Sequence, residues 1–238
     1  MKTIGIVGGL GPMATVYYME LITRMVDASV DQEHPEILVK SIPATPDRTA
    51  YILGRSKENP LPKLLQACIE LEKMGADFVT IPCVTAQFFY QELEKNCNIP
   101  LLSLCGNVAE EIAKKNIKKV GILATTGTIQ SKVLEQTFQE NGIDIVVPDS
   151  MHQEMVMDII YKQVKQGRPV QWEQFEQVAD GLYSEGAQKV LLGCTELSLL
   201  KKEREMDTRI IDVLEVLAQK AVLASGAKLK AEYEDVIR

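Results

Sequence analysis

The chain has 238 residues, 46% of them hydrophobic and 25% charged, with a formal net charge of −7. This composition is typical of a folded globular chain, and the length suits one large domain or two domains of about 100–150 residues. An acidic chain without clustered basic residues is a poor match for a phosphate backbone, so no nucleic-acid partner is expected. No apolar run approaches the roughly 18 residues that span a bilayer, so we expect no membrane segment and, by default, a cytoplasmic location.

Apolar runs of strand length alternate with helical patterns along the chain. One helix is indicated where leucines and Cys68 recur at helical spacing over residues 61–71 and Gly75 stands where a C-terminal cap belongs. Strands that alternate with helices predict parallel βαβ units in an α/β fold. The expected strands cover residues 3–8, 36–41, 77–82, 100–105, 119–124, 144–148 and 189–194.

The two halves of the chain repeat one another. GADFVTIPCVT begins at Gly75 and GAQKVLLGCTE begins at Gly186, so each places a cysteine eight residues after its glycine, at the end of an apolar strand. A second match, IGIVGGLGP and VGILATTGT, precedes these cysteines by 79 and 74 residues. Two small doubly wound domains are therefore predicted. Ligands in such sheets bind beyond the carboxyl ends of the strands, where Cys83 and Cys194 fall.

Cys83 and Cys194 are the candidate catalytic residues. A single cysteine at the end of an apolar strand is more often a small buried side chain than a catalyst. Two equivalent cysteines change this expectation, because inversion of a carbon centre needs one group to remove a proton and another to deliver a proton to the opposite face. A helix N-terminus favours the thiolate, so one cysteine can be thiolate while the other keeps its proton. Thr85 and Thr195, in the turns that follow, are candidate ligands of a substrate carboxylate or ordinary N-caps.

Other motifs carry weaker signals. GGLGPMA from Gly8 has the GxGxxA spacing of a dinucleotide site, but the next strand ends in Lys40 and Ser41 where an acidic ribose ligand is expected. The five cysteines form no CxxC pair and have only two histidines as companions, so neither a metal site nor a disulfide framework is expected. By themselves, Arg48 in a loop and Lys165 near a helix end are typical surface cations.

Over essentially its whole length the sequence resembles the aspartate/glutamate racemase family. The resemblance rests on GIVGGLGPMAT, PATPDRTA, GADFVTIPC, LATTGT, IIYKQVKQG and LLGCTEL, in this order. It implies a cofactor-independent enzyme of two similar α/β domains, acting on a small amino-acid substrate, and a homodimer because members commonly dimerise. It implies Cys83 and Cys194 as the acid/base pair, and a substrate site formed by Arg48, Thr85, Thr125, Lys165 and Thr195.

The resemblance also implies a boundary that is not a halfway cut. The last strand and helix, from about Arg209, are expected to return to the first domain. The first domain would then comprise residues 1–98 plus 209–238, and the second residues 99–208. The active site is expected in the cleft between them.

The sequence departs from the family beside the first cysteine. The family usually reads CNTAH there, whereas this chain reads CVTAQ, with Val84 and Gln87 in place of the amide and the imidazole. Val84 removes a polar contact next to the thiol of Cys83. The substrate implied by the family, aspartate or glutamate, is the expectation that this departure affects most.

Several functions remain open at this point. Racemisation of an acidic amino acid is the expected reaction, while maleate isomerases and hydantoin racemases of the wider superfamily are the related alternatives. Arylmalonate decarboxylases use one such cysteine, so the presence of two disfavours that activity. A two-lobed protein that closes on a metabolite without catalysis is the alternative from another class.

Overall fold

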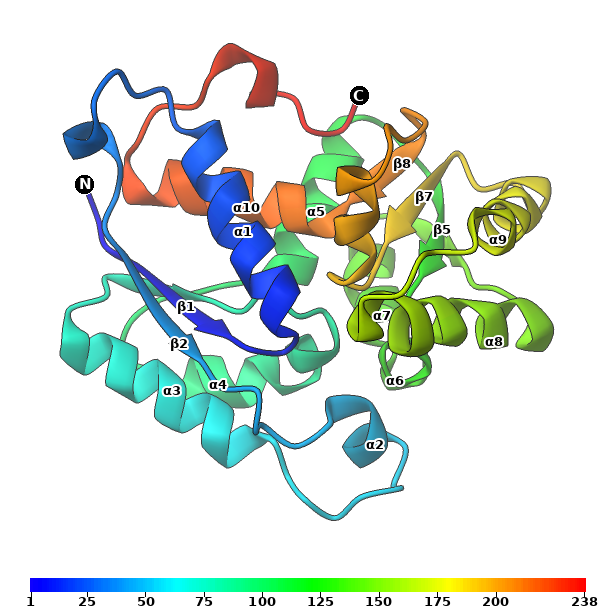
Figure 1. The fold of residues 1–238 in the computed structure, drawn as a ribbon, viewed down its shortest axis with the longest axis horizontal. Helices are drawn as coiled ribbons and strands as arrows, with labels where there is room; N and C mark the ends of the chain where they lie inside the picture. Colours follow the sequence, from blue (N-terminus) through cyan, green and yellow to red (C-terminus); the bar gives the residue numbers. More distant parts are fainter.

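A computed structural model describes all 238 residues, and Figure 1 shows its two α/β halves. The first sheet has four parallel strands in the order β2-β1-β3-β4. Its strands are β1 (Ile4–Gly8), β2 (Ile37–Ser41), β3 (Phe78–Thr80) and β4 (Leu101–Leu102).

The second sheet repeats this arrangement. Its four parallel strands have the order β6-β5-β7-β8, so the first strand of each half again lies between the second and the third. The fold class predicted from the repeat, two similar doubly wound halves with parallel sheets, is confirmed. The strands are β5 (Lys119–Leu123), β6 (Asp144–Val146), β7 (Lys189–Leu192) and β8 (Ile210–Asp212).

Helices separate the strands, as the alternating pattern predicted. The amphipathic segment that was expected to end at Gly75 forms α3, and Gly75 caps it with a positive φ of 104°. The helices are α1 (Pro12–Met25), α2 (Arg48–Ile52), α3 (Leu61–Met74), α4 (Tyr90–Asn96), α5 (Leu104–Lys114), α6 (Thr126–Ser131), α7 (Val133–Glu140), α8 (Ser150–Asp158), α9 (Trp172–Ser184) and α10 (Val213–Ser225). None of them combines the length and the apolar character that a membrane crossing requires.

The alternation of side chains along the strands places helices on both faces of each sheet. Ile4 and Ile6 of β1 pack in the same apolar cluster as α1, α5 and α10, while Val7 on the opposite face packs with α3 and α4. In the second sheet, Ile122 belongs to the first of these clusters and Leu123 packs with α8 and α9. One core of 33 buried residues therefore joins the two halves, and Figure 1 shows α1, α5 and α10 grouped together within it.

The edge strand of each sheet lies outside the residue range that was expected for its domain. β4 pairs with β3, so Leu101–Leu102 belong to the first sheet, although residues 99–208 were assigned to the second domain. β8 pairs with β7, so the expectation that the last strand returns to the first domain is wrong. The last helix does cross over, because α10 packs against α1 as well as α5. Each sheet gains its edge strand from the next apolar run along the chain, and only the helix that follows reaches the other half.

Candidate active site

Both catalytic candidates lie beyond the carboxyl ends of the third strands. Cys83 follows β3 and Cys194 follows β7, and their side chains are only 5% and 6% exposed. They line one small cavity together with residues of both halves. The prediction that the repeat directs two thiols into a shared site agrees with this placement.

Each cysteine turn contains a backbone hydrogen bond between residues two apart, one position earlier in the second turn than in the first. The backbone N–H of Cys83 donates to the Ile81 carbonyl at 2.7 Å, and Gly193 donates to Leu191 at 2.9 Å. Each turn continues into a 3₁₀ helix, at Thr85–Phe89 and Leu197–Lys202. The tight turns fix each thiol at the end of a buried strand.

The repeat extends to the fourth residue after each cysteine. The Oε1 atom of Gln87 accepts a hydrogen bond from the backbone N–H of Leu104 at 3.1 Å, at the start of α5. Ser198 donates from its hydroxyl to Oδ1 of Asp212 at 2.5 Å, at the start of α10. Gln87, one of the two departures from the family pattern, thus has a structural role that fastens the first cysteine turn to a helix.

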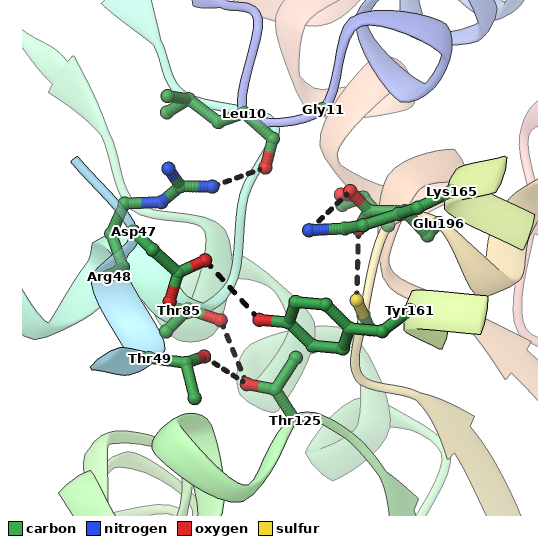
Figure 2. Close-up of polar contacts among 12 residues, drawn as sticks. Leu10, Gly11, Asp47, Arg48, Thr49, Thr85, Thr125, Tyr161, Lys165 and Glu196 are labelled. Atoms are coloured by element: carbon green, nitrogen blue, oxygen red, sulfur yellow. Dashed lines mark hydrogen bonds and ion pairs between the residues drawn. The ribbon is translucent and has the colours of Figure 1, made fainter. Parts of the chain in front are cut away.

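A group of threonine hydroxyls forms one wall of the site, as Figure 2 shows. Thr85 lies 3.1 Å from Thr125 and 2.9 Å from Thr128, between hydroxyl oxygens, and Thr49 donates to Thr125 at 3.2 Å. Thr125 also caps α6 by accepting from the backbone of Thr128. The wall is compact because α6 carries Gly127, where a Cβ would lie 2.8 Å from the Cα of Thr49. These buried hydroxyls can rotate to donate to a carboxylate.

Thr195 is placed differently from Thr85. Its hydroxyl donates to the Pro82 carbonyl at 3.1 Å, and its side chain is 1% exposed. This hydrogen bond joins the second cysteine turn directly to the first. Thr195 therefore has a structural partner in addition to the substrate contact that the resemblance implies.

Arg48 is buried in the site and is not a surface cation. Its guanidinium donates to the carbonyl of Leu10 at 2.8 Å and to that of Pro46 at 3.1 Å, while Nε has no partner. Burial acts to lower the pKa of Arg48, but Cys83 and neighbouring carboxylates raise it overall. The chain thus holds a permanent positive charge beside Cys83.

Lys165 brings a second cation from the other half. Its ammonium lies 3.5 Å from Oε1 of Glu196 and 4.5 Å from the centre of the Tyr161 ring, and its side chain is 27% exposed. Tyr161 belongs to a π-helical turn at Ile159–Gln163, a feature that is frequent at functional sites. Burial acts to lower the pKa of Lys165, but Glu196 and then Cys194 raise it overall.

Glu196 is a site residue that the sequence reasoning missed. The carboxylate is 4% exposed, and its Oε2 accepts a hydrogen bond from the Cys194 thiol at 3.0 Å (Figure 2). Burial and Glu196 raise the pKa of the Cys194 thiol well above its ordinary value. A signal was present in the sequence, because an acid stood two residues after a candidate catalytic cysteine in the same turn.

Three further residues of the site were not predicted. Thr49 and Thr128 contribute hydroxyls to the threonine wall, and Tyr161 contacts Lys165. Tyr161 also donates to Asp47 of the first half at 3.4 Å. The available signal was their proximity in sequence to predicted residues: Thr49 to Arg48, Thr128 to Thr125 and Tyr161 to Lys165.

The space around the two cysteines is narrow in this structure. The cavity around the two cysteines has a volume of about 10 Å³, room for about one water molecule. It shares Arg48, Lys165 and Glu196 with an adjoining cavity of about 410 Å³ beside the N-terminus of α1. A larger hollow of about 600 Å³ beside α6 and α7 contains neither cysteine, so its size does not make it the reactive site. No three His, Cys, Asp or Glu side chains are grouped as metal ligands would be.

The family model described as Asp/Glu/Hydantoin racemase matches residues 7–221. The chain belongs to this family. The racemase is 29% identical to the aspartate racemase of Picrophilus torridus. The two structures match over the full length of both chains, with a TM-score of 0.85. It is 26% identical to the broad specificity amino-acid racemase RacX of Bacillus subtilis (strain 168), over 92% of this chain and 96% of that one. The glutamate racemase of Aquifex pyrophilus, 22% identical with a TM-score of 0.60, shares the fold over 92% of this chain and 82% of that one.

Family membership confirms two expectations from the sequence. The racemase is an enzyme of the isomerase class, and its two halves have the α/β architecture of solved relatives. The relatives differ in the amino acids that their names state, so the family does not by itself give the substrate.

Proposed function

We propose that this enzyme racemises an acidic amino acid, aspartate or glutamate, with Cys83 and Cys194 as its two acid/base groups and without a cofactor. The observation that carries the proposal is the equivalent placement of two buried cysteines, one from each half, around one cavity. Such a pair can reach opposite faces of a bound α-carbon, as inversion requires.

The proposed reaction consists of two proton transfers. The thiolate of one cysteine takes the α-proton, so that the C–H bond breaks, an S–H bond forms and the electron pair spreads into the α-carboxylate. The thiol of the other cysteine then gives its proton to the opposite face and becomes the thiolate. Substrate and product have the same composition, and the positions of thiol and thiolate are exchanged.

Charge and hydroxyl groups support an acidic substrate. Arg48 and Lys165 are cations from opposite halves, and both line the cavity beside the cysteines. A guanidinium and an ammonium in a water-poor site bind a side-chain carboxylate well. We assign the α-carboxylate to the hydroxyls of Thr85 and Thr125, with Thr195 nearby. The full-length likeness to an aspartate racemase points in the same direction.

A second candidate is racemisation of a wider set of amino acids. The charge of Lys165 already faces the buried carboxylate of Glu196 at 3.5 Å, which reduces its attraction for a second carboxylate. Val84 is buried in the lining of the same cavity, where it offers no hydrogen bond. RacX, named for broad specificity, is a relative over nearly the whole chain.

Incubation with L- and D-amino acids in deuterium oxide tests these proposals. Aspartate and glutamate should gain α-deuterium and lose optical purity, while alanine, leucine and lysine show how broad the activity is. Exchange with every amino acid would favour the broad racemase. No exchange with any, but ligand-induced stabilisation, would favour the metabolite-binding alternative. Turnover of maleate or of hydantoins instead would assign the chain to those superfamily activities.

The remaining expectations concern assembly and location. We propose a homodimer in a cytoplasmic setting, on the basis of the family alone. Light scattering after size-exclusion chromatography measures the oligomeric state, and a monomer at assay concentration would exclude the homodimer.

A further inference from the structure

The two halves of the site are not chemically equivalent. Two residues after Cys83 the chain has Thr85, whose hydroxyl bonds to Thr125 and Thr128. Two residues after Cys194 it has Glu196, whose carboxylate bonds to the thiol itself. The repeat therefore places a neutral hydroxyl beside one cysteine and a carboxyl group beside the other.

The position of Glu196 is built into the fold. One oxygen accepts from the thiol at 3.0 Å, and the other, which has no hydrogen-bond partner, lies 3.5 Å from the Lys165 ammonium. Gly11, the N-cap of α1, makes room for it, because a Cβ at this position would lie 2.7 Å from Oε1. The 14-residue α1 directs its positive N-terminal end to the same place.

We propose that Glu196 is a positioning residue that holds Cys194 as the thiol in the resting enzyme, so that Cys83, beside Arg48, removes the first proton and Cys194 delivers one. The inference rests on the two-cysteine function proposed above. It adds an order to that function: the enantiomer whose α-hydrogen faces Cys83 meets an enzyme that is already in the correct protonation state.

The physical reason is the interaction of like charges at short range. A Cys194 thiolate would place a second negative charge about 3 Å from a buried carboxylate, whereas the thiol donates a hydrogen bond to it. Burial and Glu196 both raise the pKa of Cys194, and Lys165 opposes them only in part. The other charged or titratable groups that line this cavity are Arg48, Asp47, Tyr161 and Cys83. When the environments of two titrating groups shift their pKa values apart, the group with the higher pKa is usually the acid and the other the base.

The inference fixes the sign of a pH effect. Activity needs Cys194 protonated, so the alkaline limb of kcat/KM reports loss of its proton in the free enzyme. Replacement of Glu196 by Gln removes the neighbouring negative charge, which makes the thiolate easier to form and lowers the pKa of Cys194. The alkaline limb should then move to lower pH by about one pH unit or more, because removal of a close charge changes a pKa by this amount.

The experiment compares three variants with the unaltered enzyme. Glu196→Gln removes the charge, and Gly11→Ala keeps the charge but displaces the carboxyl group. The matched control is Glu203→Gln, which removes an exposed charge from the other end of the same 3₁₀ helix. Two quantities are measured against pH: kcat/KM, and the rate at which iodoacetamide alkylates each cysteine, read by peptide mass spectrometry. Thermal melts show whether each variant is folded.

In Glu196→Gln, Cys194 should be alkylated about tenfold faster at pH 8, because more of this thiol is then ionised. The alkaline decrease in kcat/KM of this variant should begin at a lower pH than in the unaltered enzyme. Gly11→Ala should change in the same direction by less, and Glu203→Gln should match the unaltered enzyme. Alkylation of Cys194 that keeps its pH dependence in both site variants would overturn the inference. Alkylation is independent of turnover, so absence of racemisation in the unaltered enzyme would instead count against the proposed function.

Discussion

The hydroxyl of Thr195 donates a hydrogen bond to the Pro82 carbonyl at 3.1 Å, so the residue after one cysteine is tied to the residue before the other. The contact spans 113 positions of sequence and is fully buried. It is a direct link between the two cysteine turns, and it sets how far apart the two thiols can move.

Thr195→Val should test this link. Valine keeps the shape but loses the donor, which leaves the Pro82 carbonyl unpaired at a cost of about 1–3 kcal/mol in the free energy of unfolding. We expect kcat to fall about tenfold or more because the two thiols lose their fixed spacing. Thr195→Ser keeps the donor and is the matched control. Urea unfolding and racemisation kinetics give the two quantities, and equal behaviour of both variants would show that the hydrogen bond does not matter.

Cys83→Ala and Cys194→Ala should each abolish racemisation. Inversion uses one group on each face, and neither thiol reaches the face of the other. The fold should remain, since both side chains are small. Cys194→Ala should still exchange the α-hydrogen of one enantiomer for deuterium, because Cys83 remains as the base, whereas Cys83→Ala should exchange the other enantiomer more slowly, because Glu196 disfavours the Cys194 thiolate. A single variant with unchanged racemisation would remove that cysteine from the mechanism.

Arg48→Ala and Lys165→Met should weaken the use of aspartate and glutamate about ten- to a hundredfold in kcat/KM, equivalent to about 1.5–3 kcal/mol. Alanine as substrate is the internal control, because it has no side-chain carboxylate to lose. Arg48→Ala should also lower the stability, since Leu10 and Pro46 lose a charged donor. Equal losses for alanine and aspartate would show that these cations do not select the acidic side chain.

Val84→Asn should raise activity on acidic substrates, if the site is a weakened form of the common family arrangement. The change buries an amide in the core, so a stability loss of about 1–3 kcal/mol is expected alongside. Adding Gln87→His should cost further stability, because the N–H of Leu104 loses its acceptor. Racemisation rates and thermal melts of both variants are compared. Lower activity of Val84→Asn on aspartate and glutamate would mean that Val84 belongs to a differently built site.

Asp212 should make stability depend on pH. Burial, and then Glu215, raise the pKa of this N-cap carboxyl of α10 from 3.8 to about 6. The folded state then binds more protons than the unfolded state between about pH 4 and 6, so this contribution to stability falls as pH rises through that window. Asp212→Asn should remove a stability change on the order of 2–3 kcal/mol across the window. Urea unfolding at several pH values checks it, and Glu215→Gln should move the window to lower pH.

Much of the fold could be read from the sequence because its signals are local. Buried parallel strands are short apolar runs, and every expected run from residue 3 to residue 194 contains a strand. The internal repeat placed the two cysteines at matching strand ends. Pairing at the sheet edges is a tertiary property, and the sequence does not show which sheet accepts β8.

The site was predictable only where a residue carried a motif. Arg48 and Lys165 were found through the family resemblance, since an isolated cation is usually solvated. Glu196 stands two residues after Cys194, which makes it a candidate, but its contact with the start of α1 at Gly11 does not follow from sequence spacing. Thr49 and Tyr161 come from α2 and a π-helical turn, short elements whose direction depends on packing against the other half.

The cavity of about 10 Å³ around the cysteines is too small to admit an amino acid as it stands. An amino acid is several times larger than one water molecule, so side chains of the lining, or the two halves themselves, have to move before it reaches both cysteines and again before it leaves. The closed arrangement is the one in which the thiols, the cations and the hydroxyls are all in place, and the substrate has to supply the binding energy that restores it. We therefore expect turnover to be no faster than this motion, whatever the intrinsic rate of proton transfer.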